Sequence, residues 1–212
     1  MVRDNNISNN ISFLNIQEHP KIIGIDLTGS ENKASGFCLL ENAFAVTCKV
    51  KRDEEILELI ENYKPVIISI DSPLSLPAGR ISPFDDDPGR KLYGINRSCE
   101  RQLLARGIRS YPPLIPSMQK LTQRGINLAG ILRKRGYIVI ESYPGGAQDI
   151  LGIPRKSKGL DQLKNGLGLL GISGEYIQTH VSHDEIDAVT CALVGLFFLR
   201  GYYEALGSEQ EG

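Results

Sequence analysis

The sequence predicts an α/β fold, in which a mixed five-stranded sheet carries helices on both faces. Three apolar, β-rich runs lie close together near the beginning of the chain, and such spacing favours an antiparallel meander. Two later runs are apolar throughout, which is typical of parallel strands that are buried on both faces. Amphipathic stretches between and after these runs supply the helices.

The five strands can be placed in order along the chain. Lys21–Leu27 is the first, and Ser35–Val50 contains the next two around a turn at Glu41–Asn42. Pro65–Asp71 is the fourth, and Gly136–Ser142 is the fifth, which the sequence YPGG ends. A meander that feeds a parallel strand–helix–strand unit has the topology of RNase H-like folds.

The helices are marked by their caps and by apolar periodicity. Asp53 is a suitable N-cap for the amphipathic segment DEEILELIENY, and Ser182 can cap a long final helix that extends to about Leu206. Further helices are expected near Ser98–Arg106, Ser117–Arg135 and 157–170. The stretch after Asp71 is rich in Pro, Gly and Asp, so a long loop is expected there.

These elements predict a single domain over residues 20–212, with a loop and helical insertion at about 72–135. Residues 1–19 are polar and Asn-rich without periodicity, and we expect them to form a flexible arm. The insertion carries 12 Lys and Arg against 4 Asp and Glu, whereas both flanking parts are acidic. This asymmetry is expected either for an anionic partner or for a solvated loop and helix face.

Composition argues against several classes of protein. The longest apolar run, Ala188–Leu199, is shorter than the roughly 20 residues that span a bilayer. The beginning, MVRDNNISNNISF, lacks the apolar region of a signal peptide. The four cysteines are scattered without a C-x-x-C pair, which argues against a zinc site and a disulfide framework. We therefore expect a cytoplasmic protein that does not bind membranes.

Five acidic residues fall where strands end or where the last helix begins. Ligand sites of open α/β sheets lie at such strand ends, and residues three apart on a helix share a face. Clustered carboxylates repel one another unless cations neutralise them, and their hard oxygen atoms suit Mg²⁺ or Mn²⁺. The predicted metal ligands are Asp26, Asp71, Asp184 and Asp187. The predicted catalytic residues are Asp26, Asp71, Asp187 and Glu141, the last as a ligand or as a base beside the metal.

Each of these residues also has a plainer interpretation. Asp71, which precedes Ser-Pro, could form a turn, and Asp184 could be a first-turn residue favoured by the helix dipole. Asp187 and Asp26 are harder to explain in this way, because both adjoin apolar runs and an unpaired buried carboxylate is costly.

Six basic residues could contact nucleic acid: Arg97, Arg101, Arg106, Arg109, Lys156 and Lys158. The arginines could track a phosphate backbone, and the lysines follow the fifth strand, from where they could reach a scissile phosphate. A solvated helix face is the alternative for the arginines. Because Arg97 and Arg101 bracket Glu100, internal pairing is also possible.

Five segments resemble, in order, the successive motifs of domain-of-unknown-function family 429: IIGIDLTG, IISIDSPLSLP, RSCERQLLARGIRSYP, VIESYPG and HDEIDAVTCAL. The resemblance covers about Ile22 to Leu199 and implies a predicted nuclease of the RNase H-like superfamily. The layout is also similar to that of Holliday-junction resolvases, whose acidic positions are matched here by Asp26, Asp71, Asp184 and Asp187. Resolvases carry Glu where this chain has Asp71, and the Pro-rich insertion after Asp71 is a second departure.

The sequence thus supports three functional hypotheses. The first is a nuclease that cleaves phosphodiester bonds with two divalent ions. The second is a non-catalytic binding module that holds nucleic acid or a protein with its basic middle segment. The third is an actin-like or sugar-kinase-like phosphotransferase, because IDLTGS resembles the first phosphate loop of that superfamily. That superfamily needs two such domains and a later Gly-rich motif, and this chain has length for one domain.

Overall fold

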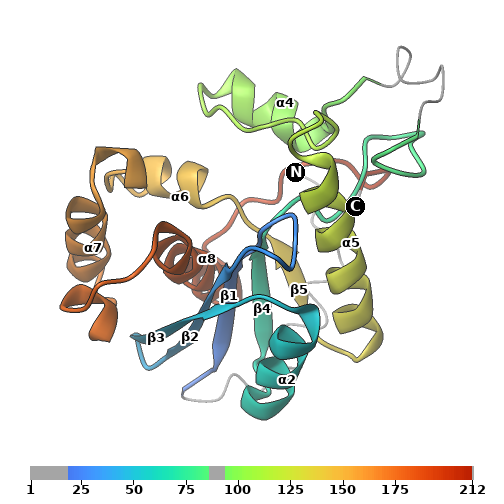
Figure 1. The fold of residues 1–212 in the computed structure, drawn as a ribbon. Coiled ribbons are helices and arrows are strands. Elements are labelled where there is room, and N and C mark those ends of the chain that lie inside the picture. Colours follow the sequence, from blue (N-terminus) through green and yellow to red (C-terminus); the bar gives the residue numbers. More distant parts are fainter. Residues whose placement is uncertain (1–18, 86–93, 212) are drawn as a thin grey trace.

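The computed structural model describes residues 19–85 and 94–211 as an α/β domain. The arm expected at 1–19 therefore lies outside the described residues, apart from His19, as does the part of the insertion at 86–93. Figure 1 shows a central sheet with helices on both of its faces.

The sheet contains the five predicted strands in the order β5-β4-β1-β2-β3, followed by β6. The strands are β1 (Ile22–Asp26), β2 (Ser35–Glu41), β3 (Phe44–Val50), β4 (Ile67–Asp71), β5 (Val139–Glu141) and β6 (Ser173–Gly174). Strands β1, β2 and β3 form the antiparallel meander, and β4 runs parallel to both β1 and β5. The fold is RNase H-like. The sixth strand was not predicted, because two residues carry no periodic signal.

The helices differ from the prediction at three places, the first being that Arg52, and not Asp53, is the N-cap of the helix that follows β3. They are α2 (Asp53–Tyr63), α4 (Ser98–Ala105), α5 (Gln119–Lys134), α6 (Pro144–Ile150), α7 (Leu160–Leu169) and α8 (His183–Leu199), with 3-10 turns η1 (Lys156–Lys158) and η2 (Glu175–Ile177). Helix α6 begins at Pro144, within the segment that was read only as a strand stop, because proline is tolerated in the first turn of a helix. Helix α8 ends at Leu199 rather than near Leu206, because Gly201 takes a positive φ of 76° and closes the helix.

Two apolar cores lie on opposite faces of the sheet. Alternate residues of β1 point to opposite faces, so Ile22 contributes to the core under α8, whereas Ile23 and Ile25 pack toward α2 and α5. Figure 1 shows α2 and α5 on one side of the sheet and α8 on the other. The face that each residue occupies is therefore known from its position in the strand.

Helix α8 lies unusually close to the sheet because glycines stand beneath it. A Cβ atom on Gly24 of β1 would lie 2.0 Å from the carbonyl oxygen of Ala188. A Cβ atom on Gly36 of β2 would lie 2.0 Å from the carbonyl oxygen of Asp184. Both distances are shorter than any tolerable contact, so only glycine permits this approach of the first turns of α8.

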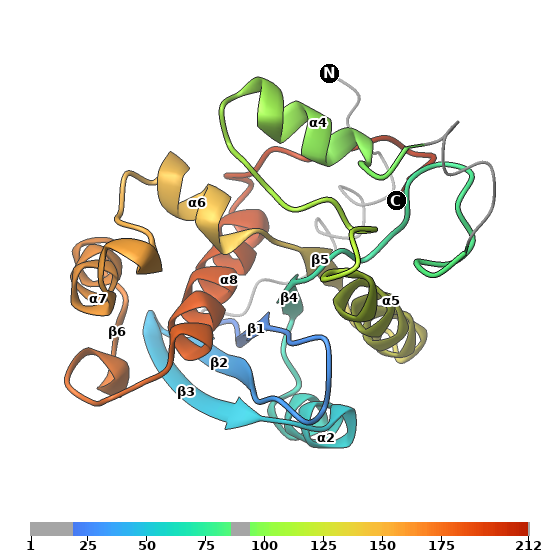
Figure 2. The ribbon, with the colours of Figure 1, turned by 45° about the horizontal axis from the view of Figure 1, so that its top comes forward.

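The chain after α8 returns along the insertion. Figure 2 shows this dark-red segment running beside α4. Glu204 accepts two hydrogen bonds of 2.6 Å from the guanidinium of Arg106. Glu211 is buried and accepts hydrogen bonds from the backbone N–H groups of Ala78 and Ser98, so that it satisfies a free donor at the beginning of α4. The final segment thus fastens the insertion to the rest of the domain.

Candidate active site

Asp26 and Asp71 lie side by side at one edge of the sheet. They are the last residues of the parallel strands β1 and β4, and their Cα atoms are paired in register. Asp26 is two positions from Gly24 along β1, so its side chain lies on the face that α8 covers. Both side chains are shielded from solvent, since Asp26 is only 9% exposed and Asp71 is half-buried.

Asp187 reaches the same point from α8. Ser182 caps this helix and forms reciprocal hydrogen bonds with Glu185, which fixes where the first turn begins. Asp187 is 4% exposed, and its Oδ1 atom accepts a hydrogen bond of 2.9 Å from the buried Nε2 of Gln148. Gln148 also donates to the hydroxyl of Thr190, one turn further along α8. The orientation of Asp187 is therefore fixed by Gln148 of α6, which is itself bonded to Thr190 of α8.

Lys156 of η1 connects Asp187 with Asp26. Its Nζ atom lies 2.6 Å from Oδ2 of Asp187 and 4.0 Å from Oδ2 of Asp26. Burial lowers the pKa of Lys156, but attraction to Asp187 and the hydrogen bond with it outweigh this effect, so that the pKa is raised overall. Lys156 is consequently a charged ammonium group between two carboxylates that come from different elements.

The three carboxylates carry more negative charge than the single ammonium group can balance. Burial, followed by the charges of Asp71 and Asp187, raises the pKa of Asp26 well above its usual value. Burial and the charge of Asp187 raise the pKa of Asp71 to about 8, although Lys156 partly opposes this shift. The Oδ2 atom of Asp26 is buried and accepts no hydrogen bond from the described part of the chain. Crowded carboxylates with an unsatisfied oxygen atom are a donor set that fits Mg²⁺ or Mn²⁺.

Asp184 stands at the margin of this group. It lies in the first turn of α8 and is half-buried, and its charge contributes to the raised pKa values of Asp26 and Asp71. It forms no ion pair within residues 19–85 and 94–211. Asp184 therefore lies at the edge of the carboxylate group rather than at its centre.

Glu141 lies on the other face of the sheet from Asp71. Its Cα partner across β4 is Ile70, not Asp71, and Ile70 belongs to the core beneath α2 and α5. Alternation along the strands therefore directs Glu141 away from the face where the aspartates meet. Its carboxylate instead accepts hydrogen bonds of 2.8 and 2.5 Å from Arg97 and of 2.8 Å from the backbone N–H of Leu74. This arrangement disfavours the predicted role of Glu141 as a ligand or base, although its charge still raises the pKa of Asp71.

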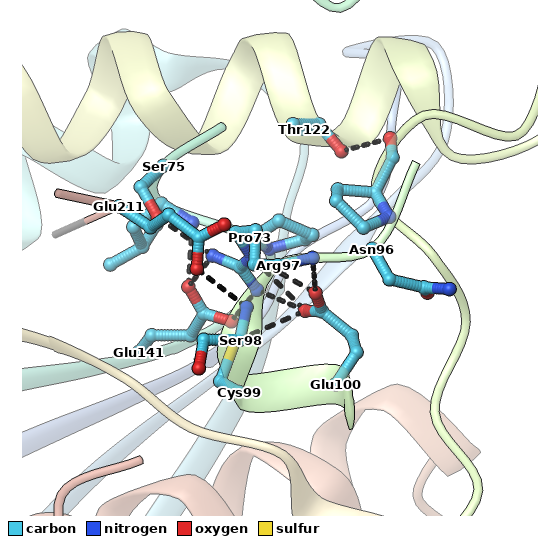
Figure 3. Close-up of polar contacts among 12 residues, drawn as sticks. Pro73, Ser75, Asn96, Arg97, Ser98, Cys99, Glu100, Thr122, Glu141 and Glu211 are labelled. Atoms are coloured by element: carbon cyan, nitrogen blue, oxygen red, sulfur yellow. Dashed lines mark hydrogen bonds and ion pairs between the residues drawn. The ribbon is translucent and has the colours of Figure 1, made fainter. Parts of the chain in front are cut away.

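Arg97 is an interior residue, not a surface contact. It is 3% exposed, and its guanidinium donates to Glu100 as well as to Glu141 and Ser75 (Figure 3). Ligand atoms of Cys99, Glu100 and Glu141 lie within 4.8 Å of one another, but Arg97 already supplies the positive charge among them. The internal pairing that the sequence left open is therefore what the structure contains, and Arg97 is removed from the predicted nucleic-acid surface.

The remaining basic residues differ in whether an acidic neighbour already balances their charge. Arg101 donates to the carbonyl oxygen of Asn96 and lies 3.9 Å from Glu211, whereas Arg106 is paired with Glu204. Arg109 is exposed and makes no ion pair within the described ranges. Its carbonyl oxygen accepts a hydrogen bond of 2.6 Å from the Tyr143 hydroxyl, which holds the backbone in place.

Arg109 and Arg101 line a hollow of about 240 Å³ beside α4. Lys158 is exposed on η1, close in sequence to Lys156. The structure therefore leaves Arg109 and Lys158 accessible to an anionic ligand, while Arg101 and Arg106 are partly neutralised.

Two residues near the site were missed by sequence analysis. Gln148, which orients Asp187, belongs to α6, and no helix was predicted there. Arg155 precedes Lys156 and is held by Asp149 and by the Tyr143 hydroxyl. The sequence carries no signal for Gln148, because its burial follows from the packing of a helix that was not predicted.

Comparisons with known proteins found similarity among solved structures only. Neither protein-family models nor curated protein sequences match the chain. Among solved structures, the yeast mitochondrial Holliday junction resolvase Ydc2 is similar, with 12% sequence identity and a TM-score of 0.44. The alignment covers 95% of this chain and 88% of that chain. Membership of family 429 thus stays a prediction, and the RNase H-like fold follows from the strand order described above.

Two further expectations can be compared with the structure. Within the described residues, no helix is long and apolar enough to cross a bilayer. All four cysteines carry free thiols, and Cys38 and Cys191 are buried in the core.

Proposed function

We propose that this protein is a metal-dependent nuclease that hydrolyses phosphodiester bonds of nucleic acid. The observation that carries the proposal is the grouping of three acidic residues from two strands and a helix. Asp26 and Asp71 end paired strands, and Lys156 lies 2.6 Å from Asp187 and 4.0 Å from Asp26. One buried oxygen atom of Asp26 accepts no hydrogen bond from the described residues. Such a cluster is expected where divalent cations complete the charge balance. Asp26, Asp71 and Asp187 would hold Mg²⁺ or Mn²⁺, with Asp184 as an additional ligand.

Bound divalent ions would supply an activated water and neutralise the charge that develops on the phosphate. The residues of the chain contribute positioning. The paired ends of β1 and β4 fix Asp26 and Asp71, and Gln148 holds Asp187 in one orientation. Because the ligands are carried by packed elements rather than by loops, the site is preorganised.

The first prediction concerns catalysis. Asp26→Asn should reduce metal-dependent cleavage by at least about 100-fold, because it removes a ligand from the centre of the cluster. The measurement uses single-stranded, double-stranded and branched DNA and RNA, in Mg²⁺, in Mn²⁺ and in EDTA. Asp161→Asn, at an exposed position in the first turn of α7, is the matched control and should retain activity. Cleavage by the Asp26→Asn protein at the wild-type rate would refute the proposal.

A non-catalytic binding module is the second candidate, and one observation favours it. Lys156 already contributes a positive charge at Asp26 and Asp187, so part of the charge of these residues is balanced without a metal ion. Nucleic-acid binding without cleavage, in either metal, would support this candidate. ATP turnover measured in parallel would instead support the phosphotransferase hypothesis.

The second prediction concerns the contact surface. Arg109→Ala should weaken nucleic-acid binding several-fold and reduce the slope of log affinity against log salt by about 1, because one phosphate contact is lost. Arg135→Ala is the control, since Arg135 is also exposed but pairs with Glu61 of α2. Binding is measured by fluorescence anisotropy over a salt series in EDTA, so that cleavage does not interfere. An unchanged slope for Arg109→Ala would place the contact surface elsewhere.

A further inference from the structure

Lys156 is placed in the site by a backbone that is held firmly. The preceding residue, Arg155, donates to both carboxylate oxygens of Asp149 and to the Tyr143 hydroxyl. Within η1, the N–H of Gly159 donates to the carbonyl oxygen of Lys156. The N–H of Lys158 also donates to the carbonyl oxygen of Arg155, so the turn that carries Lys156 is held by backbone hydrogen bonds as well as by the Arg155 side chain.

The side chain of Lys156 nevertheless remains able to leave. It is 43% exposed, and its long flexible stem can carry the ammonium group into solvent without movement of the backbone. By contrast, its two acidic neighbours are almost completely buried on β1 and α8. Within the contact, the lysine is therefore the mobile partner and the carboxylates are the fixed ones.

The ammonium group of Lys156 contacts the oxygen atom of Asp187 that would otherwise be available to a metal ion. Of the two Asp187 oxygens, Oδ1 is used by Gln148, and Oδ2 faces Lys156 at 2.6 Å. The same ammonium lies 4.0 Å from Oδ2 of Asp26, which has no hydrogen-bond partner in the described chain. A divalent ion binds carboxylate oxygen at roughly 2.0–2.6 Å, so an ion shared by Asp26 and Asp187 would come into the space of the ammonium and be repelled by it.

We propose that Lys156 is a built-in competitor of the divalent cation. Its ammonium group balances part of the negative charge of Asp26 and Asp187 in the metal-free protein, and it must withdraw when the ion binds. This inference rests on the proposed function, since it assigns regulation to the same metal site. If Lys156 competes with the ion, the metal affinity depends on a residue that is not itself a ligand. Metal binding then also releases the Lys156 ammonium group at the edge of the site.

The third prediction tests this competition through metal affinity. Lys156→Met keeps the length of the side chain and removes the charge, so the affinity for Mn²⁺ should increase by roughly tenfold, at the lower end of the changes that neighbours of metal sites produce. Lys158→Met, two residues away in the same 3-10 turn, is the matched control and should leave the affinity unchanged. Affinity is measured by calorimetric titration of Mn²⁺ into the full chain without nucleic acid, and circular dichroism verifies that each variant is folded.

A second measurement uses the wild-type protein alone. Acetylation of surface amines, quantified by mass spectrometry, should modify Lys156 several-fold faster when Mn²⁺ is present, while Lys158 should react at the same rate in both conditions. Equal Mn²⁺ affinity of the wild-type and Lys156→Met proteins, or slower acetylation of Lys156 with metal, would overturn the inference. If in that case Asp26→Asn still abolishes Mn²⁺ binding, the proposed function stands without it. If neither wild-type nor Lys156→Met binds Mn²⁺, the metal-dependent function fails together with the inference.

Discussion

In EDTA, the free energy of unfolding of the wild-type protein should fall as the pH rises from about 4 toward 8, and Asp71→Asn should remove most of this fall. The folded pKa of Asp71 is raised to about 8 by burial and by the charge of Asp187. A carboxyl group with a raised folded pKa binds its proton more tightly in the folded state, so its contribution to stability is complete below the unfolded pKa. That contribution is lost as the pH rises through the folded pKa. Each pKa unit corresponds to about 1.4 kcal/mol, so the expected loss is several kcal/mol.

This prediction is measured by chemical denaturation at several pH values, with and without Mn²⁺. Near pH 7.5 in EDTA, Asp71→Asn should be more stable than wild type, because an amide does not ionise beside Asp26 and Asp187. Added Mn²⁺ should raise the melting temperature of the wild type and have little effect on the variant. Asp26→Asn should behave in the same way, since burial also raises the pKa of Asp26. If both variants are less stable than wild type at every pH, the aspartates are structural hydrogen-bond acceptors rather than crowded metal ligands.

Arg97→Met should destabilise the protein by about 3–5 kcal/mol, the usual effect of removing one member of a buried ion pair. The guanidinium lies between Glu100, which is 7% exposed, and Glu141, and it joins the beginning of α4 to the end of β5. Without it, Glu100 keeps an uncompensated charge in the interior. The measurement is chemical denaturation at pH 7.

A variant that also removes the acidic partners of Arg97 distinguishes the loss of the ion pair from a loss of packing. The triple variant Arg97→Met, Glu100→Gln and Glu141→Gln carries no buried charge at this place and should recover most of the lost stability. Surface contact with nucleic acid would give a different pattern. In that case Arg97→Met would leave stability unchanged and would reduce the salt dependence of binding.

Much of the fold could be predicted because its strands are marked by composition. Runs such as Ile22–Asp26 and Ile67–Asp71 are mostly apolar and end in a carboxylate, which is typical of buried parallel strands. In the structure these two carboxyl-terminal residues are paired in register. Helix α6 could not be predicted in the same way. Its first residues, Pro144, Gly145 and Gly146, are individually typical of turns, and tertiary packing rather than propensity makes them helical.

The placement of the candidate site residues could be predicted only where the periodicity of a strand or helix was clear. For Asp26 and Asp71 the position at a strand end was enough, and for Asp187 the apolar run that follows it indicated a buried face of α8. For Glu141, the difference of one residue in the register of β5 decided which face it occupies, and no sequence pattern reports that register. The burial of Arg97 could not be predicted either, because its partner Glu141 is 44 residues away along the chain.

The glycines beneath α8 extend the site beyond the residues that carry its chemistry. Gly24 and Gly36 have no functional group, yet any larger residue at either position would separate α8 from the sheet and move Asp187 away from Asp26. In a complete scan of substitutions, these two positions should therefore be as intolerant as the carboxylates, although neither would be found by a search for reactive side chains. The placement of Asp187 thus depends on two positions where a side chain is missing, so a list of functional groups alone underestimates how many positions are constrained to preserve the candidate site.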